Sequence, residues 1–129
     1  AEDKSGFYRS TNRGERWEKM SGYSTSGNYY QEIICDPKNV DRVYSMNTFA
    51  MISNDGGKSF QMLGEKHKHV DNHALWIDPS NTDHLLIGCD GGIYETWDLA
   101  KTWHYKPNLS VTQFYKVAVD NAEPFYNIY

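Results

Sequence analysis

The hydrophobic positions of this 129-residue chain fall in short runs, and most runs end at glycine, proline, asparagine or aspartate. Runs of this length bounded by turn residues are typical of β-strands. Eight of them form two groups of four: residues 30–35, 42–46, 49–53 and 58–63, then residues 74–77, 84–89, 92–96 and 101–105. We therefore predict two units, each made of four short antiparallel strands.

Two turn landmarks recur along the chain with nearly the same period. The first begins at Ser10, Ser53 and Thr96, which are 43 residues apart. The second begins at Asp36, Asp78 and Asp120, which are 42 residues apart. Four antiparallel strands in about 43 residues is the spacing of a β-propeller blade. The sequence thus predicts an all-β fold, a portion of a β-propeller about three blade-lengths long.

The period also divides the chain into parts of one propeller segment. Residues 1–29 are expected to hold the last two strands of a blade and a loop. Residues 30–72 and 73–112 are each expected to hold a full blade and an interblade loop, and residues 113–129 the first strands of another blade. Partial blades expose strand edges. We therefore expect the chain to associate with further blades or with copies of itself.

The first landmark has the pattern Ser/Thr-x-Asp-x-Gly-x-Ser/Thr-aromatic, which fits a tight turn between two strands. The Asp accepts hydrogen bonds from its own turn, the Gly adopts a positive φ, and the aromatic residue packs into the core. Ala100 replaces the Gly in the third copy, where it is expected to be strained. The residues given this structural role are Ser10, Asn12, Gly14 and Trp17, then Ser53, Asp55, Gly57 and Phe60, then Thr96, Asp98 and Trp103.

Residues 53–60 resemble the Asp-box (BNR-repeat) motif of sialidases, sortilin-type receptors and xyloglucanase-like propellers. Residues 69–103, with Asp71-Asn72-His73-Ala74 and Asp90-Gly91-Gly92, and residues 108–115 are similar to bacterial propellers of the sortilin-like or BNR-repeat glycosyl hydrolase type. The resemblance implies six to ten blades in a whole protein, Asp boxes away from the substrate face, and an extracellular or periplasmic location.

The resemblance leaves two functions open. One is a segment of a carbohydrate-active propeller that binds or hydrolyses glycans on the face opposite the Asp boxes, and which we expect to be inactive alone. The other is a non-catalytic, sortilin-like module that binds a protein or peptide or serves in assembly. Sialidase chemistry is rejected for this segment, because Arg13 and Arg16 lie within an Asp-box turn and leave few arginines to converge elsewhere.

The net charge and the hydropathy of the chain argue against some classes of partner. Thirteen basic and seventeen acidic residues give a net charge of −4, with no basic run, which argues against nucleic acid as a partner. The longest apolar run, residues 74–77, is far below the roughly 20 residues of a membrane-spanning helix. Residues 1–4 lack the apolar stretch of a signal peptide. No cofactor is expected.

The two cysteines, Cys35 and Cys89, lie in strand-like runs. They are open to two interpretations: a disulfide, or a pair of small buried thiols, which is the commoner situation. The chain has no CxxC, so a cysteine-based zinc or redox site is not indicated.

The order of the strands in a blade indicates which turns carry the candidate catalytic residues. If the two landmark turns lie on one side of each blade, the second-to-third turns and the interblade loops lie on the other. Asp90 stands in such a turn, ahead of a Gly-Gly pair as the catalytic Asp does in xyloglucanase-like propellers. Asp71 is a conceivable second group, since glycoside hydrolysis normally needs two carboxylates. The alternative for Asp90 is a turn former.

Histidines surround Asp71. His67, His69, Asp71 and His73 alternate, so an extended backbone would point all four the same way, as a metal site requires. The alternatives are an exposed polar loop or a ligand-facing role for Asp71 and His73, so no metal is assigned. The residues predicted to contact a ligand are His69, His73, Tyr29, Tyr30 and Asn47, the tyrosines because they can stack on sugar rings. Lys66 and Lys68 are expected in a solvated loop.

Overall fold

The chain folds into antiparallel β-sheets, which confirms the predicted fold class. The computed structural model describes residues 4–25, 30, 32–109 and 117–129, and this part of the chain contains no helix. Its strands are β1 (Phe7–Arg9), β2 (Glu18–Ser21), β3 (Ile33–Cys35), β4 (Val43–Ser45), β5 (Met51–Ser53), β6 (Gln61–Met62), β7 (Asn72–Ile77), β8 (Leu85–Cys89), β9 (Gly92–Thr96) and β10 (His104–Tyr105).

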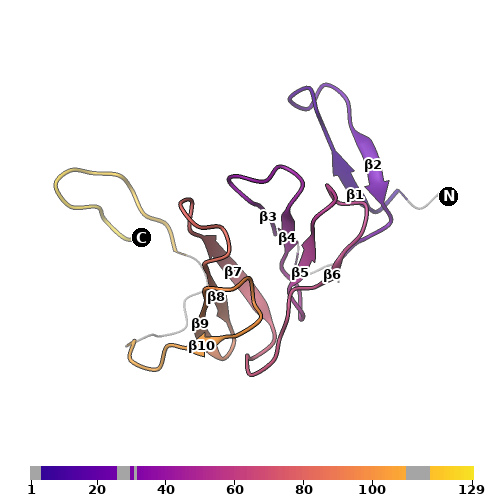
Figure 1. Cartoon of the computed structure of the whole chain (residues 1–129). Helices are drawn as coiled ribbons and strands as arrows, with labels where there is room; N and C mark the ends of the chain where they lie inside the picture. The colour runs from indigo at the N-terminus through magenta and orange to yellow at the C-terminus, as the bar shows by residue number, and fades with distance from the viewer. Residues whose placement is uncertain (1–3, 26–29, 31, 110–116) are drawn as a thin grey trace.

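The strands form three sheets that follow one another along the chain (Figure 1). The first sheet is the hairpin β1–β2, the second is β3–β6 and the third is β7–β10. Within each sheet every strand pairs with the next one in sequence. The two four-stranded units predicted from the sequence are therefore present. The strand expected at 58–63 is only two residues long, because the residues before Gln61 belong to a tight turn.

The apolar core is shared between the second and third sheets. Tyr44 pairs with Ile34 on one side and Ile52 on the other, so the three side chains lie on one face of the second sheet. Leu85 pairs with Ile77 in the third sheet. Both sets join one buried cluster, whose other members are Met46, Ala50, Leu63, Ile87, Ala100 and Trp103. Since burying a large apolar side chain contributes about 1.5–3 kcal/mol, this contact is what holds the two sheets together.

The turn that begins at Ser53 in the second sheet, which we call an Asp-box turn for its sequence pattern alone, is closed by its own side chains. Asp55 Oδ1 accepts hydrogen bonds from the Ser53 hydroxyl (2.8 Å) and the Ser59 amide (2.9 Å), and Oδ2 accepts one from the Ser59 hydroxyl (2.6 Å). The Ser53 hydroxyl in turn accepts from the Gly57 amide at 2.8 Å. Hydrogen bonds from Ser59 and Ser53 hold the pKa of Asp55 well below its usual range.

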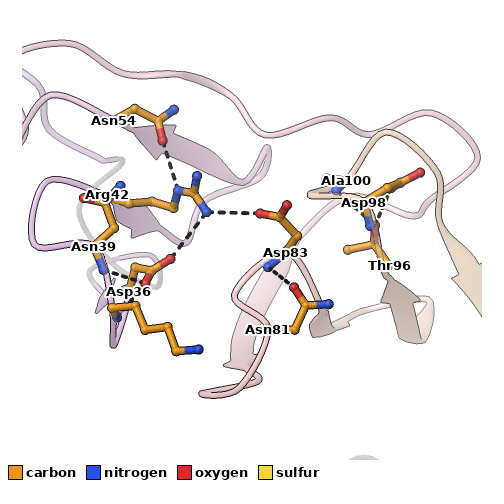
Figure 2. Close-up of polar contacts among 10 residues, drawn as sticks. Asp36, Asn39, Arg42, Asn54, Asn81, Asp83, Thr96, Asp98 and Ala100 are labelled. Atoms are coloured by element: carbon orange, nitrogen blue, oxygen red, sulfur yellow. Dashed lines mark hydrogen bonds and ion pairs between the residues drawn. The ribbon is translucent and has the colours of Figure 1, made fainter.

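The third sheet repeats this arrangement residue for residue. Asp98 accepts from the Thr102 amide at 2.9 Å. It also accepts from the Thr96 hydroxyl at 2.8 Å, while the Ala100 amide donates to the Thr96 hydroxyl at 3.0 Å (Figure 2). The bonds from Thr102 and Thr96 lower the pKa of Asp98 to about 2. Ala100 has a φ of 65°, so the strained position expected from the sequence is present.

The first sheet carries the same turn with an amide in place of the carboxylate. Asn12 Oδ1 accepts from the Ser10 hydroxyl (2.9 Å) and the Arg16 amide (2.9 Å), and the Gly14 amide donates to the Ser10 hydroxyl at 2.8 Å. An uncharged side chain thus supports the same backbone path. This turn needs a short side chain whose oxygen can accept two hydrogen bonds, and both Asn and Asp have one.

The aromatic residue that ends each Asp box has a different environment in each copy. Phe60 stacks on Tyr23 at 3.9 Å between ring centroids and meets Phe7 edge-on at 5.2 Å. Trp103 is buried, and its Nε1 donates to the Gly64 carbonyl at 2.9 Å. Trp17 is 60% exposed, so the expectation that every copy packs this residue into a core is wrong for the first.

An arginine links the second and third sheets on their Asp-box side (Figure 2). Arg42 follows the second landmark, and its Nη1 lies 3.5 Å from Asp36 Oδ2 and 3.3 Å from Asp83 Oδ1. Its Nε donates to Asn54 Oδ1 at 3.1 Å. Because Asp83 is more than half exposed, this bridge adds at most about 1 kcal/mol and serves mainly to align sheets already held by their apolar faces.

Histidine takes the place of this arginine in the third sheet. His84 stands 42 residues after Arg42, stacks on Trp97 at 3.5 Å, and reaches Asp78 (3.1 Å) and Glu95 (2.9 Å) with its two ring nitrogens. Burial alone would lower the pKa of His84, but the hydrogen bonds with Glu95 and Asp78 outweigh burial and raise it.

We expect Gly57→Ala to destabilise the protein more than Gly14→Ala does. Both glycines have a φ of 90°, so each substitution incurs the left-handed strain of about 1–2 kcal/mol. A methyl group at Gly14 meets nothing closer than 3.8 Å, whereas one at Gly57 overlaps the Phe7 ring. The overlap adds about 1–3 kcal/mol, measurable as a difference in free energy of unfolding in urea. Equal losses for the two variants would show that Phe7 does not pack there.

We also expect a pH-dependent contribution of His84 to stability. A raised pKa in the folded state means that the stabilisation is fully present below the ordinary value of about 6.5 and is lost as pH rises through the folded value. The measurement is the free energy of unfolding between pH 5 and 8.5. His84→Gln should flatten this part of the profile, and an unchanged slope in that variant would assign the dependence to another group.

Candidate functional site

The strand register places the Asp boxes and the second-to-third turns at opposite ends of each sheet. In the third sheet, Leu85 pairs with Ile77 and with Thr96, the first residue of the Asp box. At the other end, Cys89 pairs with Asn72 and Gly92. Asp90 therefore lies at the end opposite the Asp box, as the topology predicts, and so does the interblade loop that leads to Asn72. We call this the turn side.

Four polar side chains meet on the turn side. The Tyr30 hydroxyl donates to Asp71 Oδ1 at 2.8 Å, and the Tyr30 ring stacks on the His73 imidazole with 5.4 Å between centroids. His73 Nε2 lies 3.2 Å from Asp90 Oδ1. The contacts join Asp71, Tyr30, His73 and Asp90 in one continuous chain, which we call the turn-side cluster. All four were predicted as candidate site residues.

The cluster comes from three different elements. Tyr30 precedes β3 in the second sheet, and Asp71 and His73 flank the start of β7. Asp90 follows β8, and its amide donates to the Asp71 carbonyl at 3.3 Å, which ties the turn to the loop. The site thus spans the boundary between the second and third sheets. Its geometry depends on how those sheets pack.

The electrostatics of the cluster separate its two carboxylates. The hydrogen bond to Asp71, together with burial, raises the pKa of the Tyr30 hydroxyl, so the phenol stays protonated and donates to the carboxylate. Asp90 is paired with an imidazole instead, and the Asp90 and His73 side chains are 55% and 47% exposed. Asp71 is therefore held by a neutral donor, whereas Asp90 lies against an imidazole in an accessible position.

The other predicted ligand residues have different roles here. Asn47 is a backbone anchor: its carbonyl accepts from the Asn72 amide at 3.1 Å, and its side chain accepts from the Thr48 amide at 2.9 Å. His69 is exposed, and its Nδ1 lies 2.8 Å from the Val70 carbonyl. A side chain at Gly91 would overlap His69, so the two pack closely. Tyr29 lies outside the described residues.

The alternating histidines do not form the arrangement that a metal site requires. His67 and Asp71 each have a φ of 63°, so the backbone turns at both and the side chains do not share one face. Among the residues that the structure describes, no three His, Cys, Asp or Glu side chains are grouped closely enough to hold an ion. The extended backbone on which the metal hypothesis rested is wrong.

The interblade loop is braced by a buried lysine, so the prediction that Lys68 is solvated is also wrong. Its side chain is fully buried and forms an ion pair with Glu65. Its ammonium donates to Asn72 Oδ1 at 2.5 Å and to the His69 carbonyl at 2.7 Å, and it lies 5.7 Å from the centre of the Trp103 ring. Two hydrogen-bond acceptors, an ion pair and an aromatic face compensate for the loss of water around the ammonium.

The brace extends to the turn that precedes β5. Glu65 Oε1 accepts from the Ala50 amide at 2.8 Å and from the Asn72 amide side chain at 3.2 Å. The Asn72 side chain also donates to the Thr48 carbonyl at 3.0 Å, and the same carbonyl accepts from the Asp71 amide at 2.8 Å. Lys68, Glu65 and Asn72 thus fix the backbone on both sides of Asp71. Of these three residues, the sequence pointed to the site only at Asn72, because it lies between the candidate residues Asp71 and His73.

One hollow lies near the first hairpin and does not include the cluster. It has a volume of about 770 Å³ and is lined by both signs of charge, among them Arg9, Arg16 and Lys58 against Glu18 and Asp41. It also contains Asp55, whose carboxylate is committed to its turn. The hollow lies on the Asp-box side. We therefore place the candidate site on the turn side and not in this hollow.

The cysteines form no disulfide: both Cys35 and Cys89 are free thiols. Cys35 is exposed, so the interpretation as a pair of buried thiols is wrong for it. Cys89 is half-buried, and burial raises the pKa of its thiol, which keeps it in the protonated and unreactive form.

Comparisons with known proteins support the fold. No protein-family model matches the chain, and no curated protein sequence matches it. Among solved structures, the crystal structure of an ancestral GH74 enzyme is similar, with a TM-score of 0.57 and 18% sequence identity, over 81% of this chain and 15% of that one. The chain thus spans 15% of the length of that enzyme and shares the fold of a fragment of its propeller. Within the described ranges, no helix has the length and apolarity to cross a bilayer.

We expect Lys68→Met to destabilise the protein by about 3–5 kcal/mol, because it leaves the Glu65 carboxylate buried without its partner. The matched control is Lys66→Met on the same loop, where the lysine is exposed and the change should stay within about 0.5 kcal/mol. Urea unfolding of both variants measures the difference. Similar stability of the two variants would contradict the burial of Lys68.

Proposed function

We propose that this chain is a segment of a carbohydrate-active propeller that contacts a glycan on the turn side, with Asp71 and Asp90 as its two acidic groups. The observation that carries the proposal is the turn-side cluster, in which Asp71, Tyr30, His73 and Asp90 are joined by short contacts. Glycoside hydrolysis uses a pair of carboxylates in different protonation states. The similarity to a propeller of a GH74 enzyme agrees with this class of function.

The contacts of Asp71 and Asp90 suggest which catalytic role each carboxylate has. Asp71 accepts a hydrogen bond from the Tyr30 phenol, and we assign it the role of base or of stabilising positive charge on the sugar. Asp90 lies against His73 and is more than half exposed, and we assign it the role of giving a proton to the leaving group. The Tyr30 ring lies against His73, and an aromatic face of this kind can stack on a sugar ring. An extracellular or periplasmic location is part of the same proposal.

The test uses the full-length protein that carries these blades, assayed on plant and bacterial glycans. Asp90→Asn and Asp71→Asn should each lower kcat about 10²–10⁴-fold, since each removes a group that moves or stabilises charge. Asp41→Asn is the control, because Asp41 is an exposed acid paired with Arg9 away from the turn side. Unchanged turnover in both site variants would reject the catalytic assignment. Saturable peptide binding without turnover, weakened by the same variants, would instead identify a peptide-binding module.

A further inference from the structure

Residues 117–129 form a hairpin that repeats the opening hairpin of the second and third sheets. The Asp120 amide donates to the Asn127 carbonyl at 3.2 Å, and Ala118 and Tyr129 exchange amide-to-carbonyl bonds of 3.0 and 2.8 Å. Val119 forms a bridge with Ile128. The hairpin is thus closed by three main-chain hydrogen bonds, which join two residue pairs on either side of the Val119–Ile128 pair.

The bonds match those of the earlier copies. The Asp36 amide donates to the Arg42 carbonyl at 3.0 Å, and the Asp78 amide to the His84 carbonyl at 3.1 Å. In all three copies the Asp side chain also accepts from the amide two residues later. The third hairpin has one extra residue in its loop, and the Asn127 amide donates to Asp120 Oδ1 at 2.9 Å, where the Arg42 and His84 amides donate to main-chain carbonyls.

One face of this third hairpin is apolar and exposed. Val117, Val119 and Ile128 are 63%, 60% and 66% exposed. Val117 and Val119 stand 42 residues after Leu75 and Ile77, and the Val119–Ile128 pair corresponds to the pair formed by Ile77 with Leu85. In the third sheet those residues belong to the core shared with the second sheet, where Ile77 is 8% exposed and Leu85 is fully buried.

The third sheet has a face in the matching position to receive the hairpin. The second sheet presents Ile34, Tyr44 and Ile52 in one row toward the third. The corresponding row of the third sheet, one repeat later, is Trp76, Leu86 and Glu95.

This row is suited to an apolar partner despite its carboxylate. Trp76 is 48% exposed. Glu95 bonds to His84 at 2.9 Å and forms an ion pair with Lys106, so its charge is already compensated. The same ion pair, with the His84 bond, lowers the pKa of Glu95. A neighbouring element therefore has no unpaired charge to cover.

The spacing of the chain points to a contact within one molecule. Leu75 follows the end of β6 at Met62 by 13 residues, and Val117 follows the end of β10 at Tyr105 by 12. In this structure the connection from Met62 to Leu75 leads from the second sheet to the third. The connection from Tyr105 to Val117 has nearly the same length, so it is long enough to lead from the third sheet to a further one.

We propose that residues 117–129 begin a further blade, and that Val117, Val119 and Ile128 of the same chain dock on the face of the third sheet that carries Trp76 and Leu86. The contact repeats the packing of Leu75, Ile77 and Leu85 against the second sheet. It is an interaction surface independent of the turn-side cluster, so it stands or falls separately from the proposed function.

Nuclear Overhauser effects in the full chain test the contact directly. Cross-peaks between the Val119 methyl groups and the Trp76 indole are expected at low protein concentration. Cross-peaks that appear only between differently labelled copies would overturn the proposal in favour of a dimer contact. Their complete absence would show that the two faces do not meet.

A matched pair of substitutions gives the energetic test. Val119→Ala should raise the unfolding equilibrium constant about tenfold, because it removes two methyl groups from a docked face. Val40→Ala changes the same side chain at a turn where Val40 is 74% exposed, and its effect should stay within about twofold. Equal, small effects of the two variants would overturn the proposal.

Discussion

The structure depends on apolar packing between the faces of successive sheets. A four-stranded sheet has two faces and cannot bury either alone, so Tyr44 and Ile52 of the second sheet are covered only because Ile77 and Leu85 of the third lie against them. Two groups of polar contacts, one on each side of the sheets, depend on this packing. The Arg42 bridge on one side and the turn-side cluster on the other both join groups from neighbouring sheets.

The two sides use polar groups for different purposes. On the Asp-box side, the carboxylates of Asp55 and Asp98 accept hydrogen bonds from residues of their own turns. These bonds fix the backbone and leave few acceptor positions for a ligand. On the turn side, Asp71 and Asp90 each have a partner from another element, and Asp90 is more than half exposed. The same type of side chain is therefore structural in one place and accessible in the other, and register decides which.

Much of this could be predicted from the sequence because it repeats. The 43-residue period gives the four-stranded units, and the turn pattern gives even the strained Ala100. The joining of Asp71, His73 and Asp90 follows from which turns share a side of the sheet. Burial of Lys68 could not be foreseen, because it requires Glu65, Asn72 and Trp103 to converge from separate positions. His67 and Asp71, which lie on either side of Lys68, both have a positive φ, and this breaks the alternation that suggested a metal site.

The origin of Tyr30 has a thermodynamic consequence. It belongs to the segment before β3, whereas His73 and Asp90 belong to the third sheet, so a molecule that touches all three contacts two sheets at once. Such a molecule binds only while the sheets remain packed. Binding therefore stabilises the packing between the sheets by RT ln(1 + [L]/Kd), where [L] is the concentration of free ligand. Occupancy of the site would raise the melting temperature of the packed sheets.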